Sequence, residues 1–130
     1  MAKATLESHN QSPRKVRLVA DLVKGKRVPE ALAALAFLPK RAAEPVAKLI
    51  SSAAASAKQQ GEDPDTLVVK GLVVESAGML TRYMPRAFGR AALIRHRKSR
   101  VKVTLEAGSK KLESRKSAPV SSLQSPASSV

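Results

Sequence analysis

Thirty residues in the second half of the chain, 76 to 105, contain eight Lys and Arg and no Asp or Glu. Within them, the stretch RYMPRAFGRAALIRHRKSR at residues 82 to 100 carries seven permanent cations. A protein core cannot hold such a segment, because burying unpaired charge is strongly unfavourable. Pro85 and Gly89 also interrupt any long helix, at a cost of about 3 and about 1 kcal/mol relative to alanine. The segment must therefore leave the body of the protein.

This segment could form either a helix or a two-stranded ribbon. A helix would align three arginines spaced by four residues, but its two breakers leave room only for a single turn at ALIRHR. A two-stranded ribbon turning near Ala87-Phe88-Gly89 uses the positive φ that glycine allows. We expect the ribbon, at about residues 77–100, with arms of about eleven residues that reach about 35 Å. Repulsion between like charges predicts that it is loosely ordered until a polyanion surrounds it.

The segments on either side of the ribbon have the patterns of strands. LVVKGLVV at residues 67 to 74 is rich in β-branched residues and predicts a strand with both faces at least partly covered. Residues 100 to 106 alternate strictly, with Val101, Val103 and Leu105 on one side. These two segments are natural antiparallel partners. Residues 3 to 7 also alternate, as a half-buried strand would.

Three helical patterns precede the second strand. The first runs from 13 to 24, with Ser12-Pro13 at its start and Gly25 as its stop. The second runs from Pro29 to Pro39, and we expect Phe37 on its buried face. The third carries an apolar stripe that continues to Gly61, and Pro45 either lies in its first turn or bends it; the members of the stripe are Val46, Leu49, Ile50, Ala53, Ala54 and Ala57.

These elements predict an α+β fold: three helices packed on a small antiparallel three-stranded sheet, with a long protruding basic β-hairpin. We expect residues 1–106 to form a single globular domain that includes the hairpin. From residue 107 onward Ser, Lys, Pro and Gly dominate, so residues 107–130 are expected to be a disordered C-terminal tail.

The formal charge of +14 and the pI near 10.9 indicate a polyanionic partner. No run of about 18 apolar residues exists for spanning a membrane. A solvated surface would mix charges of both signs, which residues 76 to 105 do not. Arginine outnumbers lysine there six to two, and guanidinium groups match phosphate oxygens. Nucleic acid is therefore favoured over solubility alone.

A second basic cluster surrounds the first helix, although an ordinary exposed helix face explains it equally well. It comprises Ser12, Arg14, Lys15, Arg17, Lys24, Lys26 and Arg27. Only Phe37, Tyr83 and Phe88 could act as aromatic platforms, so recognition of RNA shape and backbone is expected rather than base reading by a stacked sheet.

Enzymatic chemistry has little support in the sequence. His9 and His96 lack a carboxylate at catalytic or metal-ligand spacing, and Gly25-Lys26 lacks the glycine-rich lead of a phosphate loop. With no cysteine to form a zinc site, we expect no enzyme, no cofactor and no metal. A rival from another class is a DNA-architectural protein with a basic β-arm, which would be expected to act as a dimer.

Three stretches closely resemble the bacterial large-subunit ribosomal protein family numbered twenty-two: SPRKVRLVADLVKGKRVPEAL, FLPKRAAEPVAKLISSAAASA and RYMPRAFGRAALIRHRKS. The resemblance implies a structural protein of the cytoplasmic ribosome that binds large-subunit ribosomal RNA and neighbouring large-subunit ribosomal proteins. It also implies that the hairpin lines the peptide exit tunnel, where its tip would meet the nascent peptide and tunnel-binding macrolides. No homo-oligomer is expected.

Residues matching the family's motifs give the expected sites. The tunnel tip comprises Ala87, Phe88, Gly89 and Arg90. Phe88 departs from the pattern, because related sequences often have a basic residue there. Together with the first-helix cluster, the expected RNA-binding residues are Arg14, Lys15, Arg17, Lys26, Arg27, Arg82, Arg86, Arg90, Arg95, Arg97, Lys98 and Arg100.

Overall fold

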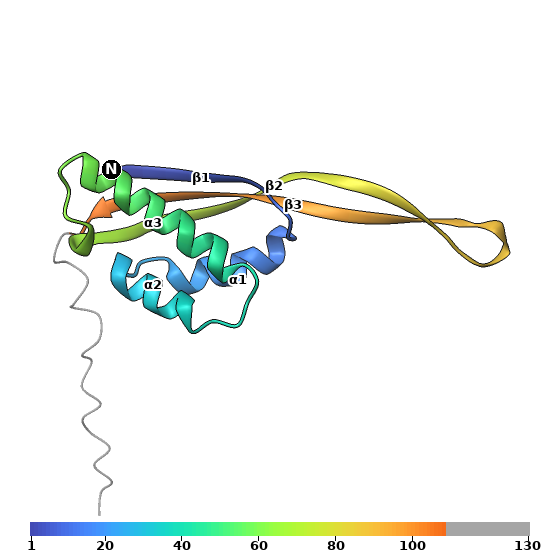
Figure 1. Ribbon diagram of the computed structural model, residues 1–130, viewed down its shortest axis with the longest axis horizontal. Helices are drawn as coiled ribbons and strands as arrows, with labels where there is room; N and C mark the ends of the chain where they lie inside the picture. Colours follow the sequence, from blue (N-terminus) through green and yellow to red (C-terminus); the bar gives the residue numbers. More distant parts are fainter. Residues whose placement is uncertain (109–130) are drawn as a thin grey trace, which may run out of the picture.

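The three strands form one antiparallel sheet in the order β1-β3-β2. The computed structural model describes residues 1–108, so the expected tail lies outside it apart from Ala107 and Gly108. The strands are β1 (Ala2–His9), β2 (Leu67–Pro85) and β3 (Ala91–Ala107). Figure 1 shows β2 and β3 continuing together far beyond the rest of the protein. The predicted sheet and its protruding hairpin are confirmed.

Three helices lie against the sheet at the end away from the hairpin tip (Figure 1). They are α1 (Pro13–Val23), α2 (Val28–Ala36) and α3 (Ala43–Gln59), and two short 3-10 turns occupy Pro64–Thr66 and Ala87–Gly89. Proline starts α1 at its first position, where no amide donor is needed, and Gly25 ends it with a φ of +80°. The α+β class with three helices is confirmed.

The core lies between the helices and one face of the sheet and is made almost entirely of Val, Leu, Ile and Ala. On α3 the small residues Ala53 and Ala57 are fully buried beside Ile50, which allows close approach of the helix to its neighbours. The sheet contributes alternating side chains from both long strands: Leu67, Val69, Leu72, Val74, Val101, Val103 and Leu105. This packing fixes the end of the β2–β3 pair from which the hairpin starts.

The two faces of β2 are covered to different extents. Only one face is buried, and Val73 on the other is 53% exposed. A register shift between Val69 and Gly71 inserts an extra residue into β2, so that Val69 and Leu72 both point into the core. The apolar run therefore reflects a bulged strand with one buried face, and its other face is only partly covered, as at Val68.

Phe37 is not a core residue. It is 90% exposed, because α2 ends at Ala36 and Phe37 lies at its C-cap, beyond the last regular turn. The buried face of α2 consists of Val28, Ala31 and Leu35. Pro39 ends the helical pattern before another turn can bring the ring inward. The alternative of a helical turn at ALIRHR is also wrong, since those residues belong to β3.

The hairpin leaves the body at a junction that we call the arm root, formed where all three strands change register. Ser99 of β3 pairs with both His9 and Ser76, and register shifts flank both pairs. Gly78 sits in the shift of β2 with a φ of +97°. Beyond it, pairing runs without interruption from Met79↔Arg97 to Pro85↔Ala91, and we call residues 79–97 the arm.

Replacing Gly78 with alanine should strain the arm root. A φ of +97° disfavours any side chain, even though no atom lies within 4 Å of the added Cβ. We expect Gly78→Ala to lower the free energy of unfolding by about 1–2 kcal/mol. Urea denaturation followed by circular dichroism measures it.

Gly71→Ala is the matched control, because it lies in the same strand, also has open space around its Cβ and lacks a positive φ. Its free energy of unfolding should change by no more than about 0.5 kcal/mol. Equal effects of the two substitutions would show that the backbone conformation of Gly78 does not hold the arm root in place.

Candidate nucleic-acid interface

A concave surface of about 740 Å³ lies where the arm leaves the body, and we call it the basic corner. Three separate parts of the chain line it: the segment from the end of β1 into α1, the loop before α3, and the first part of the arm. Its lining residues are Asn10, Gln11, Ser12, Lys15, Arg41, Leu80, Arg82, Arg95, His96, Arg97 and Lys98. Six of them are permanent cations and none is acidic, so the corner suits a polyanion.

The start of α1 adds to the positive potential of the corner. The first turn of α1 contains no acidic residue, and the Ser12 side chain makes no capping hydrogen bond. Arg14 and Lys15 occupy this turn instead, where the positive end of the helix dipole disfavours cations. An anion bound at the corner would offset that repulsion.

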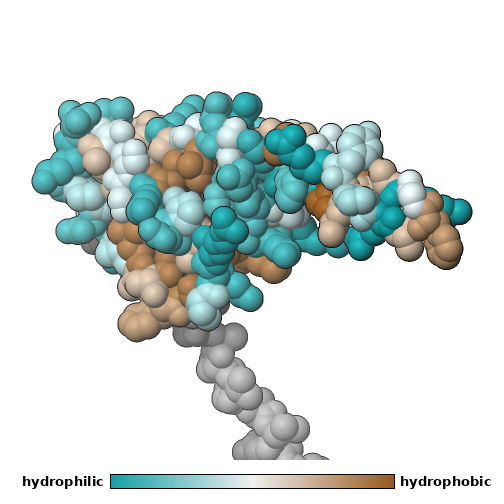
Figure 2. Space-filling view, turned by 45° about the vertical axis from the view of Figure 1, so that its right-hand side comes forward, coloured by the Kyte–Doolittle hydropathy of each residue, from teal (hydrophilic) through white to brown (hydrophobic). Residues whose placement is uncertain are grey.

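The arm presents both cations and apolar side chains on each of its two faces. Paired residues of antiparallel strands point to the same side, so Tyr83 and Leu93 share one face with Arg95 and Arg97. The opposite face carries Arg82 beside Ile94. Figure 2 shows hydrophobic residues interspersed with hydrophilic ones along the arm. A partner that contacts both faces would therefore meet charge and apolar surface on each.

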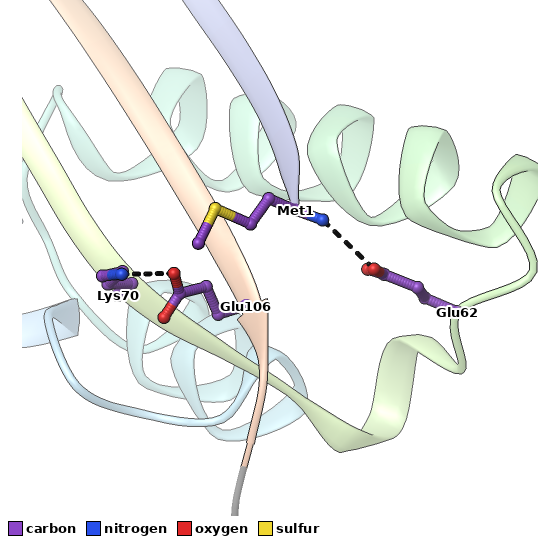
Figure 3. Close-up of polar contacts among 4 residues, drawn as sticks. All are labelled: Met1, Glu62, Lys70 and Glu106. Carbon is purple, nitrogen blue, oxygen red and sulfur yellow. Dashed lines mark hydrogen bonds and ion pairs between the residues drawn. The ribbon is translucent and has the colours of Figure 1, made fainter.

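The body differs from the arm, because four of its Lys and Arg side chains are paired with carboxylates. On the sheet face away from the helices, Lys102 pairs with Glu75 at 2.9 Å and Arg100 with Glu7 at 3.3 Å. Figure 3 shows two further pairs, between Lys70 and Glu106 and between the amino group of Met1 and Glu62.

On α3, Lys48 bonds Glu44 at 2.8 Å, and this hydrogen bond together with the lysine charge lowers the pKa of the Glu44 carboxyl. Such exposed pairs contribute little to stability, but they cancel the local field. Within residues 1–108, no ion pair involves a cation of the arm. The positive charge of the arm is therefore uncompensated.

The structure brings together only part of the expected RNA-binding set. Lys15 joins Arg82, Arg95, Arg97 and Lys98 in the basic corner. Arg86 and Arg90 flank the tip of the arm, where the Arg86 amide donates to the Arg90 carbonyl oxygen at 2.7 Å. The corner thus joins the first-helix cluster to the hairpin, which sequence patterns treated as separate patches.

The other expected residues lie outside the corner. The Arg17 guanidinium donates to the Val74 carbonyl oxygen at 3.2 Å and so connects α1 to β2. Lys26 and Arg27 follow α1 beside β2, where the Val69 amide donates to the Lys26 carbonyl oxygen at 3.0 Å. Arg14 is exposed on α1, and Arg100 is paired with Glu7.

Arg41 is the functional candidate that sequence reasoning missed. It follows Lys40 in the loop between α2 and α3, and the basic pair KR after a proline was its only signal. Arg41 lines the basic corner only because α3 packs against β1, which places this loop beside the arm root. Asn10 and Gln11 were also missed, because nothing in the sequence around them indicates a site.

Two kinds of site are missing from the part of the chain that the structure describes. Residues 1–108 contain no group of three or more His, Asp or Glu able to hold a metal ion. None of the helices in the same range combines the length and the apolar character needed to cross a membrane.

Comparisons with known proteins identify relatives along almost the whole described chain. The family model for ribosomal protein L22p/L17e matches residues 4–106. A relative from Pelobacter propionicus, large ribosomal subunit protein uL22, is 50% identical over 105 residues, which are 80% of this chain and 95% of the relative. The protein of the same name from Herpetosiphon aurantiacus is 48% identical over 108 residues, 82% of this chain and 96% of the relative.

Arg41→Gln should weaken nucleic-acid binding at the basic corner. Loss of one phosphate contact should reduce the slope of log affinity against log salt by about 0.7 to 0.9. Fluorescence anisotropy with a labelled RNA, at several salt concentrations, measures the slope. Lys48→Gln removes the same charge from a side chain already paired with Glu44, and its slope should match the wild type. Identical slopes for all three proteins would remove Arg41 from the interface.

Proposed function

This chain belongs to the ribosomal protein L22p/L17e family, and on that premise we propose that it binds large-subunit ribosomal RNA through its basic corner and its arm. As a member of the family it is a structural, non-enzymatic protein of the large ribosomal subunit. The observation that carries the proposal is the uncompensated charge of the arm, which continues into a corner lined by six cations. We treat residues 1–106 as the unit that performs this function.

Binding through the backbone of RNA fits this charge distribution. Arginines dominate the arm, and their guanidinium forks match phosphate oxygens in pairs. Where RNA segments converge, their phosphates repel one another, and the arm supplies cations on both of its faces. The body has mostly paired charges on its open sheet face, which favours contact with solvent or protein there. The arm would thus lie between RNA segments and neutralise the phosphates of both.

The tip residues support a further part of the proposal, that the arm lines the peptide exit tunnel. Residues 87–90 are all exposed and stand at the far end of the arm from the body. In that position they would meet the nascent peptide and tunnel-binding macrolides, while the body contacts neighbouring large-subunit proteins. We propose that the protein acts in cytoplasmic ribosomes as a single copy, without homo-oligomers.

The DNA-architectural alternative has no independent support in the structure. Both proposals use a basic β-arm, but the comparisons place the chain among large-subunit ribosomal proteins. An obligate dimer in gel filtration that bends duplex DNA and ignores ribosomal RNA would reverse this choice.

Neutralising the arm tests the proposed function directly. The wild-type protein should remain with large ribosomal subunits through a high-salt wash, and its RNA affinity should fall with a log–log salt slope of about 4 to 5, as for about six phosphates. A variant with Arg86, Arg90, Arg95 and Arg97 changed to Gln should wash off and show a slope about 3 units lower.

The matched control changes four body lysines to Gln: Lys3, Lys48, Lys70 and Lys102. It loses the same net charge without altering the arm or the corner. Retention of both variants through the wash, with equal salt slopes, would contradict binding through the arm.

Gly89→Val should disturb the tip without unfolding the body. Gly89 has a φ of +68°, which a β-branched residue strongly disfavours, although no atom lies within 4 Å of the added Cβ. We expect altered macrolide protection of ribosomal RNA in subunits that carry the variant, and an unchanged midpoint of urea denaturation. Gly89→Asn is the control, because asparagine tolerates this conformation. Wild-type drug footprints in the Val variant would argue against a tunnel-facing tip.

A further inference from the structure

Phe88 is the most exposed large apolar residue of the described chain. Its side chain is 100% exposed at the tip of the arm. Its backbone lies in the left-handed region, with φ 58° and ψ 34°. This conformation is unusual for a bulky residue, and such outliers concentrate at sites that bind ligands. The ring is therefore presented outward in a conformation that its own type does not favour.

Nothing within the fold accounts for a phenyl ring at this position. The turn is closed by backbone bonds alone: the Arg86 amide donates to the Arg90 carbonyl oxygen, and the Arg90 amide donates to the Ala87 carbonyl oxygen at 3.4 Å. Gly89 adopts a positive φ in the same turn, and glycine or asparagine at position 88 would form it with less strain. The ring contributes to neither the turn nor the core.

The surroundings of the ring indicate what it binds. Its sequence neighbours are Arg86, Ala87, Gly89 and Arg90, of which only Ala87 adds an apolar side chain, a single methyl group. They do provide two guanidinium groups beside one free aromatic face. Stacking on a nucleobase needs only such a face, and nearby cations neutralise the phosphates on either side of the base.

We propose that Phe88 stacks on an unpaired nucleobase of the RNA that surrounds the arm. This inference rests on the proposed function and adds a direct base contact to binding that otherwise goes through phosphates. Phe88 would fix the tip against one base, while Arg86 and Arg90 hold the adjoining phosphates. The contact selects an unstacked nucleotide and does not select its sequence, because every base has an aromatic face.

The absence of tryptophan from the chain allows a direct optical test. Phe88→Trp creates a single fluorophore at the tip, and Phe37→Trp creates one at an exposed aromatic position of the body. Each full-length variant is titrated with a 12-nucleotide single-stranded RNA and with an abasic oligomer of the same length and charge. We expect strong quenching only for position 88 with the base-bearing oligomer. Equal quenching by both oligomers, or at both positions, would overturn the proposal.

Affinities separate stacking from simple apolar contact. Phe88→Ala should weaken binding of the base-bearing oligomer about 5- to 150-fold and leave binding of the abasic oligomer unchanged. Phe88→Tyr should retain wild-type affinity, whereas Phe88→Leu, which keeps apolar bulk without an aromatic face, should lose as much as Phe88→Ala. Full affinity in the Leu variant would overturn stacking.

A photo-reactive benzophenone analogue of phenylalanine at position 88 identifies the partner in assembled large subunits. Crosslinking to ribosomal RNA is expected, and crosslinking only to nascent peptide or another protein would overturn the proposal. Retention of the Phe88→Ala protein on subunits through a high-salt wash is scored separately. If the benzophenone protein stays on the subunits but forms no crosslink to RNA, base stacking is refuted and the proposed function stands. Loss of the wild-type protein itself in that wash would refute the function.

Discussion

The hydrogen-bonded ladder between β2 and β3 is the interaction on which the rest of the structure depends. One end of it supplies seven side chains of the core, Val74 and Val101 among them, and the other end is the arm. An isolated two-stranded hairpin is marginal in water. Here the same two strands are held by a packed body, so the arm begins from a fixed position. The register shifts around Ser99 mark where one ladder changes from core element to exposed ribbon.

Charge is divided along this ladder in the same way as packing. Carboxylates accompany several cations where the strands belong to the body, as in the pairs of Glu75 with Lys102 and Glu7 with Arg100. Beyond Ser76 the described strands contain no carboxylate until Glu106, which lies back in the body. The local field is therefore nearly cancelled on the open sheet face and uncancelled on the arm. Under the proposed function, a polyanion would bind the arm and the corner and leave the sheet face for other neighbours.

Most elements of the fold were predictable from the sequence, because their signals are local. Proline and glycine bounded α1, period-two alternation identified β1 and the inner half of β3, and the breakers at Pro85 and Gly89 predicted the ribbon. The prediction for Phe37 was wrong because periodicity cannot show where a helix stops contributing to a core. The bulge at Gly71 was invisible for a related reason, since a register shift is set by cross-strand packing.

The basic corner was only partly predictable, because it is a property of three segments that meet in space. Arg82, Arg95, Arg97 and Lys98 were expected from the charge run, and Lys15 from its neighbours along α1. Arg41 was not expected, since a basic pair in a loop carries no positional information until α3 is packed beside β1. Residues such as Arg17 show the converse, that a cation in a promising cluster can also serve the fold by binding a backbone carbonyl.

The alternation of side chains along the arm determines how a partner can use it. Tyr83 and Leu93 lie on one face with Arg95, and Arg82 lies on the other with Ile94, so neither face is purely polar or purely apolar. A partner docked on one face would leave the cations and apolar side chains of the other face in water. A partner that encloses the arm satisfies the cations and covers the apolar side chains on both faces at once. Folded RNA, with phosphates on several converging segments and bases between them, has that form, whereas a single duplex groove contacts only the inserted part of a ribbon.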